Sequence, residues 1–200
     1  AQLCSLKEHG MPSLLGIKIE NFKSLEDVTL GQIGFSKGDV EPLPPLCCFI
    51  GANGSGKSSL LDVFAFISDC LKEGVESACD KPHRGGFHNL RTQNKKDPIR
   101  FQLYYLQNKD SSPITYKFSI NEKNGIPYVV EEELLQRKKE KQQYGQPFQF
   151  LSIKDGKGNV WEGDKLSSTN EDSKLNARKP KIELTDQNYL GIKTFGTLAN

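Results

Sequence analysis

Residues 46–61 read LCCFIGANGSGKSSLL and combine an apolar run, a glycine-rich turn and the start of a helix. Gly51, Gly56, Lys57 and Ser58 fill the pattern G-x-x-x-x-G-K-[ST], whose glycines let backbone N–H groups close around an anionic oxygen. A helix that begins at about Lys57 would direct its first N–H groups and the positive end of its dipole to the same point. The stretch therefore predicts a buried strand, a phosphate-binding loop and a helix.

Two side chains of this loop have expected roles that follow from their chemistry. Lys57 is expected to reach the β- and γ-phosphates of a bound nucleotide, and the Ser58 hydroxyl is expected to complete the ligand shell of Mg²⁺. Apolar residues follow at helical spacing, which predicts a largely buried helix over about residues 57–71. These residues are Leu60, Leu61, Val63, Phe64, Phe66, Ile67 and Leu71.

The composition limits the classes of protein that the chain can represent. Its 200 residues suffice for one domain with a real core or for part of a larger domain. The formal charge of +2, from 27 basic and 25 acidic residues, gives no global argument for binding to nucleic acid or to a membrane surface. No apolar run approaches the roughly 20 residues that a membrane span needs, so we expect no membrane partner.

The cysteines indicate a reducing environment. Their odd number and irregular spacing favour free thiols, and the three histidines do not add a metal-ligand pattern. We expect Cys47, Cys48 and Cys70 to be buried beside the phosphate-binding loop, where thiols behave as small apolar groups. The sequence therefore predicts a cytoplasmic protein with reduced cysteines at Cys4, Cys47, Cys48, Cys70 and Cys79.

Before and after the loop, the pattern predicts strands and a long connection. Residues 14–30 are expected to form an antiparallel hairpin, and residues 31–45 a loop. Residues 73–98 lack periodicity and are expected to form a long loop or short helical pieces. In that segment Arg84 and Arg91 could contact phosphate, although a solvated basic loop is the more common arrangement.

The second half of the chain is predicted to continue as an antiparallel meander. Residues 99–106 and 114–120 are rich in β-branched and aromatic side chains, and Asn124 with Gly125 predicts a tight turn. We expect residues 131–146 to form a solvated helix face, with a DNA-binding patch as the less common alternative for its basic run. A hairpin over 148–161, a disordered segment over 167–180 and a final helix over 189–198 complete the prediction.

Two stretches together resemble a known family. Residues 17–28 read IKIENFKSLEDV and residues 49–62 read FIGANGSGKSSLLD, which is similar to the N-terminal lobe of ABC-type ATPases. Within them the chain most resembles the RecF, SMC and Rad50 group and related AAA-family ATPases, including OLD-like proteins of repair and phage defence. The resemblance covers about residues 14–71 and is looser up to Val130. It implies an α/β fold, a P-loop NTPase lobe of ABC-ATPase type with an antiparallel β-meander beside the strand, loop and helix.

The resemblance also implies which residues form the site. Lys23 matches a basic position, often arginine, that approaches the nucleotide, although lysine lacks the bidentate fork of arginine. Gln136 is the best-placed candidate for a glutamine that senses Mg²⁺ and the attacking water, so Lys57 and Gln136 are the expected catalytic residues, with Ser58 and Gln136 at the metal. The implied phosphate- and Mg²⁺-binding positions are Asn53, Gly54, Ser55, Gly56, Lys57, Ser58 and Ser59.

Two motifs that this family needs for hydrolysis do not occur in these 200 residues. One is an apolar run that ends in Asp-Glu, and the other is the Leu-Ser-Gly-Gly type signature. We therefore expect residues 14–200 to be the N-terminal part of an ATPase domain, preceded by a leader or disordered segment at residues 1–13. Alone it should bind ATP and hydrolyse it poorly, whereas the whole protein would pair two protomers across ATP and could bind DNA.

Two other functions are compatible with the sequence. A kinase with a phosphate-binding loop and an unusual insertion would transfer a phosphoryl group to a small acceptor. A non-catalytic module would use the nucleotide structurally and bind DNA or protein through the meander.

Overall fold

The computed structural model describes residues 12–34, 41–108, 111–140, 143–161 and 180–195, which form one sheet with helices on one of its faces. The strands are β1 (Ser13–Phe22), β2 (Leu25–Gly31), β3 (Ile99–Leu106), β4 (Ile114–Lys123), β5 (Ile126–Glu140), β6 (Gln143–Lys154), β7 (Lys157–Val160) and β8 (Lys181–Glu183). The helices are α1 (Lys57–Glu73), α2 (Val75–Cys79), α3 (Phe87–Leu90) and α4 (Gly191–Phe195).

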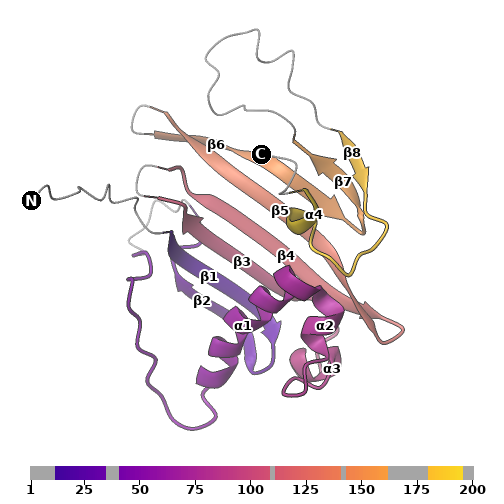
Figure 1. Cartoon of the computed structure of the whole chain (residues 1–200). Coiled ribbons are helices and arrows are strands. Elements are labelled where there is room, and N and C mark those ends of the chain that lie inside the picture. The colour runs from indigo at the N-terminus through magenta and orange to yellow at the C-terminus, as the bar shows by residue number, and fades with distance from the viewer. Residues whose placement is uncertain (1–11, 35–40, 109–110, 141–142, 162–179, 196–200) are drawn as a thin grey trace, which may run out of the picture.

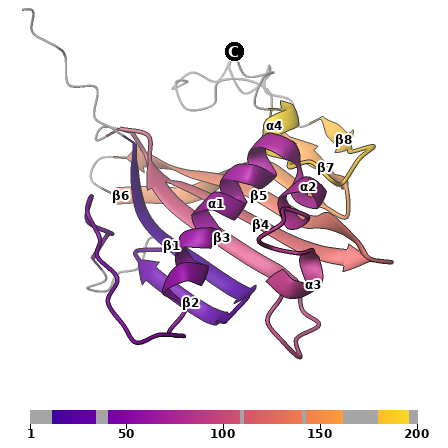
Figure 2. The same cartoon turned by 60° about the horizontal axis from the view of Figure 1, so that its bottom comes forward.

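The eight strands lie in the order β2-β1-β3-β4-β5-β6-β7-β8, and each neighbouring pair is antiparallel. The predicted hairpin over residues 14–30 and the predicted meander are confirmed. The turn between β4 and β5 uses Asn124 and Gly125 at positive φ, as a tight hairpin requires. Figures 1 and 2 show α1, α2, α3 and α4 on the same face of this sheet.

The core lies between α1 and the sheet. Phe22 of β1, Phe66 of α1 and Phe101 of β3 are fully buried, and their ring centroids lie 5.4 to 5.9 Å apart. Burial of each phenylalanine side chain contributes about 1.5 to 3 kcal/mol to folding. This cluster fixes α1 across β1 and β3, and so it fixes the position of the loop from which α1 emerges.

The buried surface of α1 is narrower than its apolar composition predicts. Its buried side chains are Leu60, Val63, Phe66, Ile67 and Cys70, which form one stripe at helical spacing. Leu61 is 63% exposed and Phe64 is 37% exposed. The prediction of a largely buried helix is wrong in this respect, because the described residues cover α1 toward the sheet and where α2 and Arg84 pack, and leave the side of Leu61 and Phe64 exposed.

The predicted buried strand before the loop is also corrected. Residues 46–50 are not in a strand, and Leu46 and Ile50 are 88% and 92% exposed. Cys47 and Cys48 are exposed rather than buried. An apolar segment becomes a buried strand only when other strands pair with it, and none of the strands that the structure describes does so.

Residues 131–140 and 143–146 form strands where a helix face was predicted. β5 extends to Glu140 and β6 begins at Gln143, and they pair from Glu131 with Lys154 to Glu140 with Gln143. High helix propensity is outweighed here by the edge of β4, which pairs with β5 along its length.

The Glu132 side chain of β5 binds the backbone of the C-terminal segment at the start of α4. Its buried carboxylate accepts hydrogen bonds from the Tyr116 hydroxyl at 2.8 Å and the Ile192 N–H at 2.9 Å, and from the Gly191 N–H. Burial raises the pKa of Glu132 above its ordinary value, although these three hydrogen bonds act in the opposite direction. The charge of this side chain is therefore compensated by the first turn of α4.

The connection after α1 and the C-terminal segment contain short elements. The short helical pieces predicted within residues 73–98 are confirmed as α2 and α3, and Cys70 is buried as expected. The final helix begins at Gly191 rather than at residue 189, since α4 spans Gly191–Phe195, and its predicted end lies outside the described residues. The segment 167–180 lies outside them up to residue 179, as does the predicted leader up to residue 11, and β8 was not predicted.

Candidate functional site

The loop before α1 has the backbone conformation that its glycines allow. Gly54 and Gly56 have φ values of 81° and 89°, a region that side chains with a Cβ rarely adopt. A Cβ on Gly56 would also lie 3.1 Å from Leu25 and 3.2 Å from the Ser24 hydroxyl. Glycine is therefore required where the loop turns into α1, and the predicted helix start at Lys57 is confirmed.

The Lys57 ammonium folds back over the loop. Its Nζ donates to the Gly51 carbonyl oxygen at 2.7 Å, the Ala52 carbonyl oxygen at 2.6 Å and the Ser55 hydroxyl at 3.3 Å. The loop therefore surrounds the Lys57 ammonium with neutral acceptors. An anion that entered the loop could replace these acceptors as the hydrogen-bond partner of Lys57.

The first turn of α1 offers further donors at the same end. Gly56 provides no side-chain cap, and the Leu60 N–H donates to the Gly56 carbonyl oxygen at 2.9 Å. The N–H groups of Lys57, Ser58 and Ser59 precede this first helical hydrogen bond, and Ser58 is exposed. Such an end of a helix attracts anions through its N–H groups and its dipole.

The turn between β1 and β2 is fixed beside this helix end. Lys23 has a positive φ of 51°, and its N–H donates to the Leu90 carbonyl oxygen at 2.7 Å. The Ser24 hydroxyl donates to the Ser59 hydroxyl at 3.2 Å, and the Lys23 Nζ donates to Asp62 at 2.7 Å. The structure thus brings Lys23 close to the first turns of α1, but it places the ammonium on a carboxylate.

Asp62 and Asp69 of α1 share a buried arginine. The Arg84 side chain is fully buried and contacts Asp62 through Nη2 at 2.9 Å and Asp69 through Nη1 at 2.7 Å. Burial acts to raise the pKa of both carboxyls, but hydrogen bonds from Arg84, Lys23 and Lys81 outweigh it and lower both pKa values. These cations therefore favour the ionised form of both carboxylates.

The sequence did not reveal this network. Arg84 was expected in a solvated loop or at a phosphate, and the structure corrects both, because it lies under α1 with its guanidinium 5.2 Å from the Phe66 ring centroid. Arg91 is likewise paired, with Glu122 at 3.1 Å. The sequence pattern that could have predicted this network is a pair of acidic residues on one face of α1, followed soon after the helix by a basic residue.

The structure does not bring Gln136 to the loop. Gln136 lies on β5 and pairs with Ile114 of β4, and its Nε2 donates to the Ser112 carbonyl oxygen at 3.1 Å. Strand pairing through β4 and β3 places Gln136 in line with Leu14, near the beginning of β1. The loop and the first turn of α1, in contrast, contact the turn that follows Phe22, at the end of β1. The Mg²⁺-sensing role of Gln136 stays a prediction.

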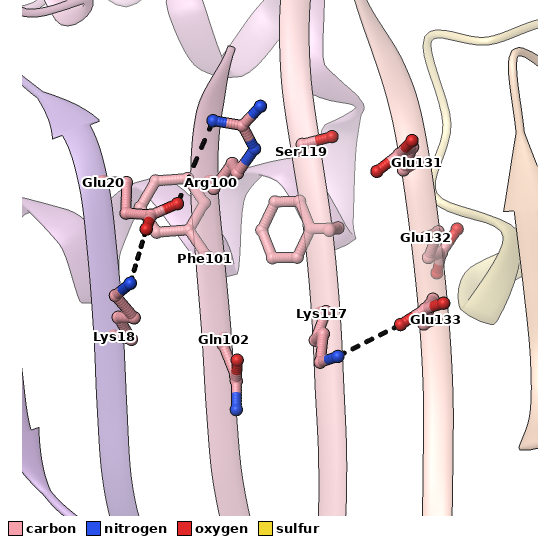
Figure 3. Close-up of a pocket in the computed structure, with 11 residues that line it drawn as sticks. Lys18, Glu20, Arg100, Phe101, Gln102, Lys117, Ser119, Glu131, Glu132 and Glu133 are labelled. Carbon is pink, nitrogen blue, oxygen red and sulfur yellow. Dashed lines mark hydrogen bonds and ion pairs between the residues drawn. The ribbon is translucent and has the colours of Figure 1, made fainter. Parts of the chain in front are cut away.

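A pocket lies on the sheet and is lined by side chains of β1, β3, β4 and β5 (Figure 3). Lys18 contacts Glu20 at 2.5 Å, and Lys117 contacts Glu133 at 3.2 Å, so these charges compensate one another. Its lining residues are Lys18, Glu20, Arg100, Phe101, Gln102, Lys117, Phe118, Ser119, Glu131, Glu132 and Glu133. These residues lie on β1, β3, β4 and β5 and include none of residues 51–59.

The residues of the loop fit a nucleotide phosphate with Mg²⁺. Within the residues that the structure describes, no cluster of three His, Cys, Asp or Glu side chains could hold a metal ion by itself. Mg²⁺ in nucleotide sites is held by few protein groups together with the phosphates and water. The exposed Ser58 hydroxyl on the first turn of α1 fits this requirement.

A glycine loop, a helix α1 that begins at lysine and an antiparallel meander are features expected of a nucleotide-binding ATPase domain. The chain matches a family described as "AAA domain, putative AbiEii toxin, Type IV TA system" over residues 46–195. Because this match covers most of the chain, the chain belongs to that family. The resemblance to an ABC-type ATPase lobe of the RecF and SMC kind is confirmed.

Among curated proteins, the chain is similar to the DNA replication and repair protein RecF of Bacteroides thetaiotaomicron. The two are 45% identical over 58 residues, which is 29% of this chain and 13% of RecF. The chain thus spans a small part of that relative, and no solved structure matches it significantly. None of the helices in the described ranges is both long enough and apolar enough to span a membrane.

Proposed function

We propose that this chain binds ATP together with Mg²⁺ in the loop Gly51–Ser59, as the N-terminal lobe of an ABC-type ATPase. The observation that carries the proposal is the loop itself. Two glycines at positive φ turn the backbone into the N-terminus of α1, and the Lys57 ammonium lies over the loop carbonyls. Membership of the AAA family supports a nucleotide as the ligand.

The chemistry of the loop explains how ATP would be held. The Lys57 ammonium would exchange its carbonyl acceptors for oxygens of the β- and γ-phosphates, which form stronger, charge-assisted hydrogen bonds. The N–H groups between Asn53 and Ser59 would donate to the same oxygens. Bound Mg²⁺ would supply charge neutralisation between the phosphates, and the Ser58 hydroxyl would be its ligand from this chain.

The exposed segment before the loop fits a larger domain. We propose that residues 46–50 become a central strand when they pair with strands from a C-terminal half of the ATPase domain, which would bury Leu46 and Ile50. That half would supply the carboxylates that this family needs for hydrolysis and the surface that pairs two protomers across ATP. The 200 residues alone would bind ATP and turn it over slowly.

The cellular role that we propose is DNA repair or phage defence in the cytoplasm. The name of the RecF relative refers to DNA replication and repair, and the description of the family refers to a putative toxin of a toxin–antitoxin system. A DNA partner would then be contacted by the assembled protein.

A calorimetric titration with Mg²⁺ and ATP tests the proposal. We expect one ATP to bind per chain, and AMP to bind at least about tenfold more weakly, because each charge-assisted hydrogen bond to a β- or γ-phosphate is worth about 1.5 to 3 kcal/mol. Inorganic triphosphate should compete with ATP, since the loop contacts phosphates rather than the base. Equal affinity for AMP and ATP, or no heat of ATP binding, would contradict the proposed site.

A further inference from the structure

Asp62 lies between two cations that use different oxygens of its carboxylate. Lys23 donates to Oδ2 at 2.7 Å, and Arg84 donates to Oδ1 through Nε at 3.1 Å and Nη2 at 2.9 Å. Asp62 is the shared partner through which the turn after β1 and the segment between α2 and α3 are joined. Either cation can therefore leave without breaking the hydrogen bonds of the other.

The position of Asp62 relates this network to the phosphate-binding loop. Asp62 follows Ser58 by four residues on α1, so the two side chains lie on the same face about one helical turn, or about 5.4 Å, apart. Ser24, next to Lys23, contacts Ser59. The Lys23 ammonium thus lies beside Asp62, about one turn of α1 after the place proposed for Mg²⁺ and the phosphates.

Arg84 lowers the free-energy cost of separating Lys23 from Asp62. A largely buried carboxylate that loses its only cation is costly, but Asp62, whose side chain is 14% exposed, would keep both hydrogen bonds from Arg84. Arg84 is itself immobile, because its side chain is fully buried and is held by Asp69 and the Ala78 carbonyl oxygen. The Lys23 side chain, in contrast, remains 26% exposed and can move.

We propose that Asp62 and Arg84 are positioning residues for Lys23. Without nucleotide, Lys23 stays paired with Asp62 beside the loop, and when a nucleotide binds, its ammonium transfers to a phosphate. This inference rests on the function proposed above. Nucleotide binding then competes with the ion pair between Lys23 and Asp62, and the strength of that pair lowers the affinity for ATP. Arg84 keeps the Asp62 charge compensated in both positions of Lys23.

The variant Asp62→Asn tests this competition in ATP titrations. The amide oxygen can still accept from Arg84, while the amide N–H₂ faces the Lys23 ammonium and removes its resting partner. We expect ATP to bind about three- to fivefold more tightly, which is the size of a partly exposed ion pair. The matched control is Asp69→Asn, which also removes a carboxylate from Arg84 but does not contact Lys23, and it should leave ATP affinity unchanged.

The double variant separates this mechanism from a structural effect. Lys23→Met alone leaves the Asp62 and Arg84 pair intact and should weaken ATP binding, and Asp62→Asn should give no gain in that background. Lys23→Arg should restore binding. If wild type binds ATP but Asp62→Asn lowers affinity or leaves it unchanged, the inference is overturned while the proposed function stands. If Asp62→Asn does not fold, unchanged affinity in Lys23→Met overturns it, and failure of wild type to bind ATP refutes the proposed function itself.

Discussion

Replacing Lys57 by alanine is expected to weaken the binding of Mg²⁺ and ATP by about 100-fold. The ammonium is the charged side chain that the structure holds over the loop, and it contacts two carbonyl oxygens and the Ser55 hydroxyl. Its loss removes charge-assisted hydrogen bonds, each worth about 1.5 to 3 kcal/mol, from the β- and γ-phosphates. Isothermal titration of the variant with ATP measures the change directly.

Lys72→Ala is the matched control for this experiment. Lys72 lies on the last turn of the same helix and its side chain is exposed, so it changes the net charge equally at the far end of α1. We expect this variant to bind ATP like wild type and to have the same far-ultraviolet circular dichroism. An undiminished ATP affinity in Lys57→Ala, with both variants folded, would show that the nucleotide binds elsewhere.

Replacing Arg84 by methionine is expected to lower the free energy of unfolding by about 3 kcal/mol. The guanidinium is fully buried, and its removal leaves Asp62 with Lys23 and the exposed His83, and Asp69 with Lys81, in a largely buried place. Removal of one member of a buried ion pair costs about 3 to 5 kcal/mol, and we use the lower end because both carboxylates retain some exposure. Urea denaturation followed by circular dichroism measures the loss.

Lys81→Met provides the comparison, because Lys81 also contacts Asp69 but is partly exposed. It should cost no more than about 1 kcal/mol. A loss below about 1 kcal/mol in Arg84→Met would mean that the arginine does not join α1 to the segment between α2 and α3. Met preserves most of the apolar volume, so the comparison reports mainly the charge.

The same network predicts how acid affects stability. The pKa values of Asp62 and Asp69 are lowered from 3.8 in the folded protein, so the unfolded chain binds more protons at low pH. Their contribution is therefore present above about pH 3.8 and is lost as the pH falls below that value. We expect the loss of stability in this range to be smaller in Arg84→Met than in wild type.

Those parts of the fold that depend on neighbouring residues could be predicted from the sequence. Gly54 and Gly56 fix the loop and the start of α1 at Lys57 through their positive φ, and Asn124 with Gly125 fixes a turn in the same way. The hairpin of β1 and β2 follows from alternation of apolar residues over a short connection. The AAA family was likewise evident in these local motifs.

Other parts depend on partners distant in sequence. Residues 46–50 have the composition of a buried strand, but burial needs paired strands, and the described residues supply none there. The Glu-rich segment after Val130 has helical propensity, yet Glu132 faces a buried tyrosine and α4, which composition cannot reveal. Arg84 was assigned to solvent because its carboxylate partners lie 15 and 22 residues earlier on α1.

The most direct measurement of the central claim follows backbone amides of the isotope-labelled chain by nuclear magnetic resonance while Mg²⁺ and ATP are added. If the loop encloses the terminal phosphates, the largest shifts fall on the N–H groups between Asn53 and Ser59, and exchange of these amides with solvent slows. Shifts confined to the pocket that includes Lys18 and Lys117, with the loop amides unchanged, would contradict the account.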